Sequence, residues 1–150
     1  MTFDKFTIKA QETVQEAVNL AQRSGQQSIE PVHLLKALMD KARDVTNFIF
    51  QKLGVNTQQI EMLLEQEIKH LPRVQGGQPY LSNDTNQILV NAENISQKMG
   101  DQFVSVEPIL LAILDSSSTA GRILKDAGCN DKDMRAAINE RRKYEGKEPM

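Results

Sequence analysis

The sequence lacks the features that mark several large protein classes. Its single cysteine, Cys129, cannot form an internal disulfide, which fits a reducing compartment. No apolar run approaches the roughly 20 residues that a membrane-spanning helix needs. The N-terminus also has no apolar stretch of the kind found in signal peptides. We therefore expect a cytoplasmic protein that has no membrane partner.

Basic residues are not in excess. The chain has 18 lysines and arginines against 20 aspartates and glutamates, so its formal net charge is −2. Proteins that bind nucleic acid without sequence preference neutralise phosphates with a basic excess, so we expect no nucleic-acid partner. The 150 residues, 39% of them hydrophobic and 25% charged, are ordinary for a globular domain.

Motifs for catalysis are also missing. Gly76 and Gly77 are not followed by the lysine and Ser/Thr of a phosphate-binding loop. Cys129 has no evident base or positive group beside it in the sequence, as a nucleophilic thiol would need. The serines at 116–118 are most simply a polar connection that ends in a helix cap. We expect that this chain is not an enzyme and holds no cofactor of its own.

What the chain does contain is an internal repeat. Shifting the sequence by 75 residues places Leu34 on Ile109 and Ile29 on Val104, and after one deleted residue the match resumes at an offset of 74. A repeat of this length indicates one supersecondary unit copied, whose two copies bury their apolar faces on each other. The identical pairs at the first offset are Ala17 and Ala92, Asn19 and Asn94, Gln22 and Gln97, Gly25 and Gly100, Gln27 and Gln102, Leu35 and Leu110, Ala37 and Ala112, and Asp40 and Asp115.

The repeat divides the chain. We expect one domain over residues 1–150, with repeat one at about 5–70, a linker at 71–82, repeat two at about 83–143 and a tail at 144–150. The linker is indicated by four turn-forming residues, Pro72, Gly76, Gly77 and Pro79.

Helix caps and apolar spacing predict four helices in each repeat. The first follows Thr7 as N-cap, carries Ile8, Val14 and Ala17 on one face and ends at Gly25. No segment alternates with period 2 for long enough to be a strand. The fold is therefore expected to be all-α, with about eight helices in two pseudo-symmetric four-helix repeats. The other predicted helices start at Pro31, run over 44–53, start after Asn56 or Thr57, start after Ser82 or Asn83, start after Ser105 with Pro108 in the first turn, run over 119–127 and start after Asn130.

One short motif has the spacing of a metal ligand set. Glu-x-x-His on two helices, with glutamates from two others, builds the carboxylate-bridged metal sites of helical bundles. Glu30 and His33 fit one such motif, but the repeat places Ser105 and Pro108 where the second would be. We expect no metal site, and a metal-dependent enzyme built on a helical bundle is a minor alternative.

Three stretches carry a family resemblance. They are TIKAQETVQEAVNLAQRSGQQSIEPVHLLKAL, HLPRVQGGQPYLSND in the linker, and AENISQKMGDQFVSVEPILLAIL. Over about residues 3–142 the chain resembles the N-terminal domain of bacterial Hsp100 (Clp-family) AAA+ unfoldases, which is built from two copies of a four-helix motif. The Leu-Pro-x-Val run in the linker looks like the ClpB-type disaggregases rather than the protease-partnered relatives.

The resemblance implies a role in protein disaggregation. Such a domain binds unfolded or aggregated polypeptide in a shallow apolar groove and helps pass it to a hexameric AAA+ ring, where ATP and Mg would bind. It also implies cooperation of the full-length protein with an Hsp70 system, and an isolated domain that is a monomer. The alternative is an adaptor-docking domain of a protease-partnered Clp unfoldase.

The resemblance also implies site residues. Thr7, Asp101 and Glu107 match positions that the family associates with substrate engagement. Each has a structural reading as well: Thr7 as an N-cap, Asp101 as a loop stabiliser, and Glu107 as an acidic residue favoured by the helix dipole in a first turn.

A groove beside these residues is expected between the fifth and sixth helices. Asn91, Ile95, Pro108 and Ile109 are its candidates, although the helical phase of Ile95 also suits the core. Asn91 and Pro108 depart from the family pattern and predict a more polar or differently shaped groove. For the phenylalanines before the first helix, Phe3 and Phe6, we favour a stapling role over exposure.

Overall fold

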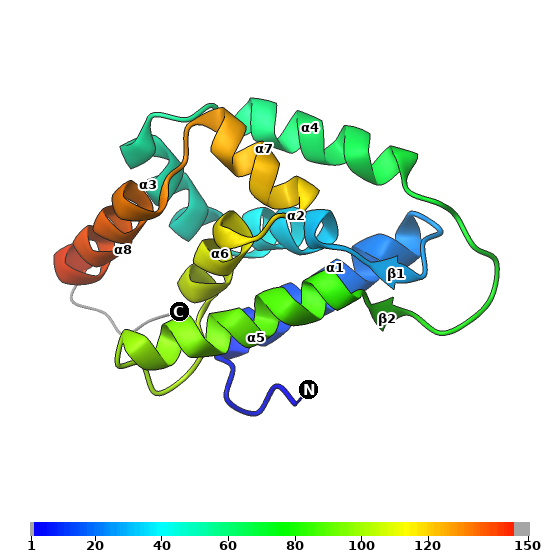
Figure 1. Ribbon diagram of the computed structural model, residues 1–150, viewed down its shortest axis with the longest axis horizontal. Helices are drawn as coiled ribbons and strands as arrows, with labels where there is room; N and C mark the ends of the chain where they lie inside the picture. The colour runs from blue at the N-terminus through cyan, green and yellow to red at the C-terminus, as the bar shows by residue number, and fades with distance from the viewer. Residues whose placement is uncertain (1, 146–150) are drawn as a thin grey trace.

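The computed structural model describes residues 2–145, which form eight α-helices and two very short strands (Figure 1). The expectation of an all-α fold of about eight helices is confirmed. The elements in order are α1 (Ile8–Arg23), β1 (Ser28–Ile29), α2 (Pro31–Lys41), α3 (Arg43–Leu53), α4 (Thr57–His70), β2 (Tyr80–Leu81), α5 (Asn83–Lys98), α6 (Val106–Asp115), α7 (Thr119–Ala127) and α8 (Asp131–Glu145).

Local sequence signals place most helix boundaries. The bounds predicted for α7 match, and α3 begins one residue earlier than predicted, at Arg43. Ile8, which the sequence analysis placed on the apolar face of α1, is 76% exposed. The buried face of α1 instead runs through Ala10, Val14 and Ala17, at helical spacing of three to four residues.

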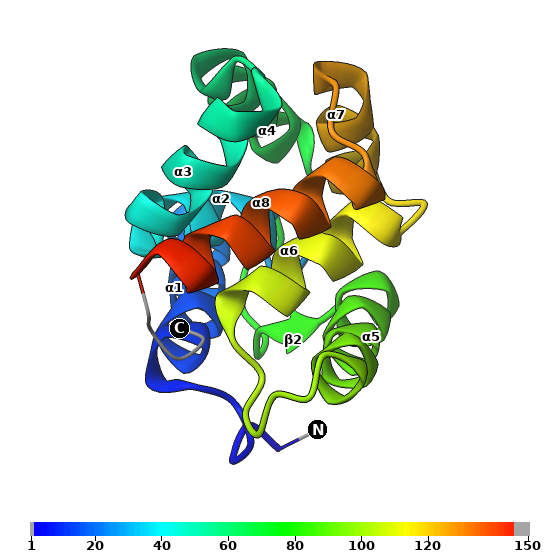
Figure 2. The same ribbon diagram turned by 90° about the vertical axis from the view of Figure 1, so that its left-hand side faces the viewer.

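The helices pack in pairs that repeat between the two halves. Helix α1 packs on α2 as α5 packs on α6, and α3 packs on α8 as α7 packs on α4. Figure 2 shows α2 and α6 in the middle of the molecule, with α1 and α5 at one end and α4 and α7 at the other. The two halves are therefore related by a pseudo-two-fold axis. Helices α2 and α6 contact each other, and each half covers the apolar face of the other half.

Two parallel backbone bridges tie the halves together. Strands β1 and β2 pair Ile29 with Leu81, and an isolated bridge pairs Phe6 with Val104. The offset of 75 maps Phe6 onto Leu81 and Ile29 onto Val104, so the two bridges are equivalent. Each joins the segment before the first helix of one half to the segment before the second helix of the other. The sequence analysis missed these strands because two residues are too few to show a period of 2.

The residues before α1 fix its start. Phe6 is buried, Phe3 packs partly against the core, and their rings meet edge to face with centroids 5.1 Å apart. The expected stapling role is therefore confirmed for Phe6. Thr7 caps α1, because its Oγ1 accepts the backbone N–H of Ala10 at 3.1 Å. Ser82 caps α5 in the same way, through the N–H of Thr85 at 3.1 Å.

Across residues 2–145, no helix combines the length and the apolar character that crossing a membrane requires.

We expect Thr7→Ala to lower the free energy of unfolding by about 1 kcal/mol, because the first turn of α1 loses its capping acceptor. Thr7→Ser keeps the hydroxyl and should stay close to the parent protein. Urea unfolding followed by circular dichroism measures both variants. Equal stability of the alanine and serine variants would contradict the capping role.

Candidate functional site

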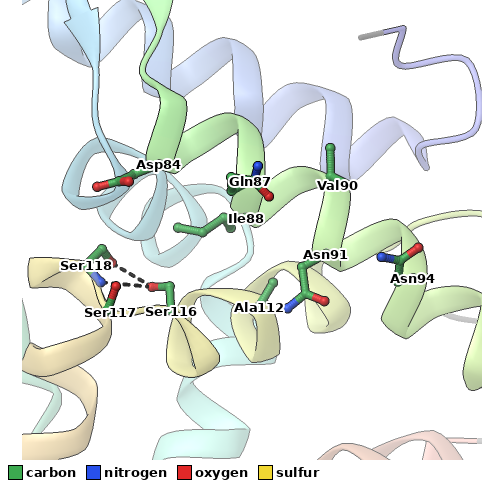
Figure 3. Close-up of a pocket in the computed structure, with 10 residues that line it drawn as sticks. All are labelled: Asp84, Gln87, Ile88, Val90, Asn91, Asn94, Ala112, Ser116, Ser117 and Ser118. Atoms are coloured by element: carbon green, nitrogen blue, oxygen red, sulfur yellow. Dashed lines mark hydrogen bonds between the residues drawn. The ribbon is translucent and has the colours of Figure 1, made fainter.

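A surface groove lies between α5, α6 and the start of α7. Its volume is about 390 Å³, and Figure 3 shows Ile88 of α5 extending toward the turn that joins α6 to α7 and Asn91 pointing toward Ala112 of α6. Asn91, one of the predicted groove residues, lies in it and donates from Nδ2 to Asp115 Oδ2 at 3.3 Å. We call it the α5–α6 groove; its lining consists of Asp84, Gln87, Ile88, Val90, Asn91, Asn94, Ala112 and Ser116–Ser118.

The α5–α6 groove is mainly polar. Amide, carboxylate and hydroxyl side chains dominate the lining, and Ile88 and Ala112 are its buried apolar members. Two of the hydroxyls already form hydrogen bonds within the protein: Ser116 Oγ and Ser118 Oγ lie 2.7 Å apart, and Ser118 Oγ accepts the N–H of Gly121. The groove therefore offers amide groups on α5 opposite a turn that is already fixed by its own hydrogen bonds.

Gly121 allows the turn to approach α6 this closely. A Cβ at this position would lie 2.6 Å from the carbonyl oxygens of Ile113 and Ser116. Any other residue would push the start of α7 away from the end of α6. The glycine thus sets the edge of the groove through close packing rather than through an unusual φ.

The other apolar residues predicted for the groove lie in the interior. Pro108 and Ile109 are buried in α6, and Ile95 is only 8% exposed on α5. None of the three lines the α5–α6 groove, and their burial leaves them almost no surface to offer a ligand. For Ile95 this agrees with its helical phase, which already suited the core.

Asp101 and Glu107 lie in a cluster of charges around Arg142. The Arg142 guanidinium donates to both carboxylate oxygens of Asp101, at 3.2 and 3.0 Å, and to Glu107 Oε1 at 2.7 Å. Glu107 is fully buried, and its Oε2 lies 3.8 Å from Arg141 Nη1. Ser105 stands at the N-cap position of α6 but makes no capping bond; its Oγ donates to Glu107 Oε1 at 3.1 Å.

The cluster joins the end of α8 to the start of α6. Burial lowers the pKa of Arg142, but the hydrogen bonds and charges of Glu107 and Asp101 outweigh it, so the net pKa is raised. The guanidinium therefore stays charged and compensates two carboxylates that could not otherwise be buried. This geometry fits the structural readings of Asp101 and Glu107. The sequence analysis missed Arg142 because it lies 35 and 41 residues away from its partners.

In the first half the repeat counterpart of Asp101 is Gln26, which pairs with His33, and both ring nitrogens of His33 form hydrogen bonds. Its Nδ1 accepts the backbone N–H of Glu30 at 2.9 Å, so Nε2 carries the proton and donates to Gln26 Oε1 at 2.6 Å. Burial lowers the pKa of His33 to about 4, although the charge of Glu30 opposes this. Within residues 2–145, no group of three His, Cys, Asp or Glu side chains could hold a metal ion.

Cys129 is buried directly after α7. Burial raises the pKa of its thiol to about 11, so the thiol stays protonated at neutral pH. A nucleophilic cysteine requires the opposite shift, and the geometry favours a structural role.

We expect Arg142→Met to lower the free energy of unfolding by about 3 kcal/mol or more, because it leaves Asp101 and Glu107 buried without their shared partner. Arg135→Met is the matched control, since the exposed pair of Arg135 with Asp131 should contribute less than about 1 kcal/mol. Urea unfolding at neutral pH compares the two. Similar losses for both variants would show that the cluster adds little stability.

Acid should destabilise the protein through His33. The pKa of His33 is about 4 in the folded state and has its ordinary value of 6.5 in the unfolded chain, so between these pH values His33 takes up a proton only when the chain unfolds. Its contribution is complete above pH 6.5 and declines as the pH falls, by about 2 kcal/mol between pH 7.5 and 5. Urea unfolding over this range should give a flatter profile for His33→Gln. The matched variant His70→Gln, at the exposed histidine, should keep the parent slope.

Comparison with known proteins identifies the domain. Residues 5–127 match the family model "Clp repeat (R) N-terminal domain". The chaperone protein ClpB of Bacteroides thetaiotaomicron is 56% identical over 145 residues, which are 97% of this chain but 17% of that protein. The ClpB of Porphyromonas gingivalis is 48% identical over 95% of this chain and again 17% of its own length. The chain thus spans about one-sixth of the curated relatives that it matches.

Solved structures show the same fold. The Hsp104 N-terminal domain from Candida albicans has a TM-score of 0.78 at 22% identity, covering 93% of this chain and 92% of that one. A ClpV N-domain in complex with a VipB peptide has a TM-score of 0.72 at 17% identity, covering 91% and 86% of the two chains. With the eight paired helices and the match to the family model over most of its length, the chain belongs to the family of Clp repeat N-terminal domains.

Proposed function

We propose that this domain engages unfolded or aggregated polypeptide for a ClpB-type disaggregase in the cytoplasm. The observation that carries the proposal is the 56% identity with a ClpB chaperone over 97% of this chain. The domain would bind a client and pass it to AAA+ modules outside this chain. ATP and Mg would be held by those modules, and the domain itself would not be an enzyme.

The α5–α6 groove is the proposed client site. An extended client exposes backbone amides, which the amide side chains of Asn91 and Asn94 can pair as donors or acceptors. Ile88 and Ala112 can cover a small apolar side chain, whose burial contributes about 25 cal/mol per Å². Immobilising the client offsets much of this gain, so affinity should be weak, as suits a domain that must release what it binds.

Peptide capture by a domain of this fold has a precedent among the solved structures. The similar ClpV N-domain was solved with a VipB peptide. At 17% identity that likeness concerns the fold and does not locate the site in this chain.

The remaining predicted residues would act by holding the groove in shape. Pro108 and Ile109 are buried in α6, one wall of the groove, and the cluster of Asp101, Glu107 and Arg142 fixes the start of α6 against α8. Thr7 would hold α1 through its cap. We propose these residues as supports of the client site rather than as direct contacts.

For the full-length protein we propose a hexamer that works with an Hsp70 system, and for the isolated domain a monomer. These statements extend the likeness to ClpB beyond the part that this chain spans.

We expect a permanently unfolded protein to shift the NMR resonances of the α5–α6 groove, and ATP to shift none. Asn94→Arg places a bulky charge in the groove at an exposed helix position and should weaken client binding about tenfold, a loss of about 1.4 kcal/mol. Asn47→Arg is the matched control, because Asn47 is also an exposed helical asparagine but lies on α3, away from the groove.

Client-induced shifts confined to the α3 and α8 face, or equal weakening by both variants, would refute the site. Binding of a folded adaptor at the α5–α6 groove together with no response to unfolded protein would favour the adaptor-docking alternative.

A further inference from the structure

The two ends of α8 are held to the rest of the domain in different ways. In its first part the buried face of the helix is apolar, and Ala137 and Ile138 lie in the core. Arg141 takes the next place on this face, at helical spacing, and is 4% exposed. No apolar side chain among residues 139–144 is buried, and Tyr144 is 84% exposed. The last turns of α8 therefore depend on charged side chains for their position.

Two arginines provide this charged anchor. The Arg142 guanidinium joins Asp101, on the turn after α5, to Glu107, in the first turn of α6. Arg141 Nη2 lies 3.5 Å from Asp44 Oδ2 at the start of α3. Helix α8 packs on both α3 and α6, and Figure 2 shows it lying across them. The arginines thus fix the end of α8 to the two helices on which it lies.

The exposed contacts of the same segment contribute less. Glu140 pairs with Lys52 at 3.0 Å, but both side chains are about half exposed, and pairs of this kind stabilise proteins little. A helix end without buried contacts opens readily, because its hydrogen bonds are few and water can replace them. Loss of the Arg142 contacts should therefore release Lys143 and Tyr144 while Ile138 stays in the core.

We infer that residues 139–144 form an ionic latch, with Arg142 as its positioning residue, which fixes the place from which the chain continues beyond α8. Six residues span about 9 Å as a helix and about 20 Å when extended, so opening the latch lengthens the connection by roughly 11 Å. The inference rests on the proposed function only for what the connection carries, the AAA+ modules. The latch itself is a property of this chain.

The latch also relates the end of α8 to the α5–α6 groove. Asp101 lies on the turn that joins the two helices of the groove, and Glu107 lies at the start of one of them. When the latch is closed, the groove has a fixed orientation relative to the end of α8. When it is open, the groove gains reach and loses this orientation.

Native-state hydrogen exchange measured by NMR tests whether the latch opens on its own. In the parent protein the amides of Lys143 and Tyr144 should exchange at rates that depend only weakly on urea, because local opening exposes little surface. The amide of Ile138 should instead follow global unfolding.

Two variants test the role of the ions. Arg142→Met keeps the helix propensity and should speed the exchange of Lys143 and Tyr144 about 100-fold, because a buried ion cluster is broken, while Leu110 in α6 stays protected. Arg142→Lys keeps the charge without the planar fork and should give an intermediate rate. Glu140→Gln is the matched control in the same segment, and it should change the rates less than about threefold.

The reach is measured by the distance between spin labels at Tyr144→Cys and Gln97→Cys, two exposed positions on α8 and α5. The native Cys129 is buried and its thiol has a raised pKa of about 11, so it should not take up the label. The otherwise unchanged protein should give a single narrow distance distribution. Adding Arg142→Met should broaden it and extend it by up to roughly 11 Å.

Three results would overturn the inference. They are exchange of Lys143 and Tyr144 only through global unfolding in the parent, equal exchange of these amides in the parent and in Arg142→Met, and a distance distribution that Arg142→Met leaves unchanged. All of these measurements are made without a client. Failure of an unfolded protein to bind would therefore count against the proposed function and not against the latch.

Discussion

The structure depends on backbone pairing between its two halves. The segment that leads into the first helix of each half finds its hydrogen-bond partner in the other half, through Phe6 with Val104 and Leu81 with Ile29. Buried backbone groups must be paired, and neither half contains both members of a bridge. The pairing also fixes where α1 and α5 begin. Because α1 packs on α2 and α5 packs on α6, it thereby helps to position α2 and α6 at the centre of the molecule. The interior is therefore shared between the halves rather than divided between them.

The turn before the second helix is held by different chemistry in each half. In the first half a neutral pair, Gln26 and His33, lies at the start of the second helix. In the second half Asp101, Glu107 and Arg142 lie there as ions. The neutral pair needs one tautomer of the histidine, so it is sensitive to acid. The ionic cluster needs all of its members, because a buried charge without its partner is costly. The first half thus has a neutral hydrogen-bonded pair here, and the second has an ionic cluster that joins α8 to the start of α6.

The helices could be predicted from the sequence because their signals are local. A serine or threonine cap, apolar residues three and four apart and a closing glycine define α7 within a single short window. Glu107 shows why the site was harder to predict from the sequence than the helices were. An acidic residue in a first turn looks like a dipole partner, and only the fold brings Arg142 to it from the far end of the chain. The resemblance pointed to Asn91, but the serines opposite it at 116–118 read as an ordinary connection. The apolar candidates, such as Ile109, lie on the buried faces of their helices and therefore belong to the core.

The crossed bridges also bear on how such a domain arises. A single copy of the repeated unit would have one leading segment and one acceptor strand, and the two belong to opposite sides of the pseudo-two-fold. One copy alone would leave both without partners, and two identical copies would satisfy each other in a symmetric homodimer. Gene duplication and fusion then turn an intermolecular contact into an intramolecular one, which no longer depends on protein concentration. Fusion also allows the two halves to diverge in sequence, so that each can acquire its own surface residues.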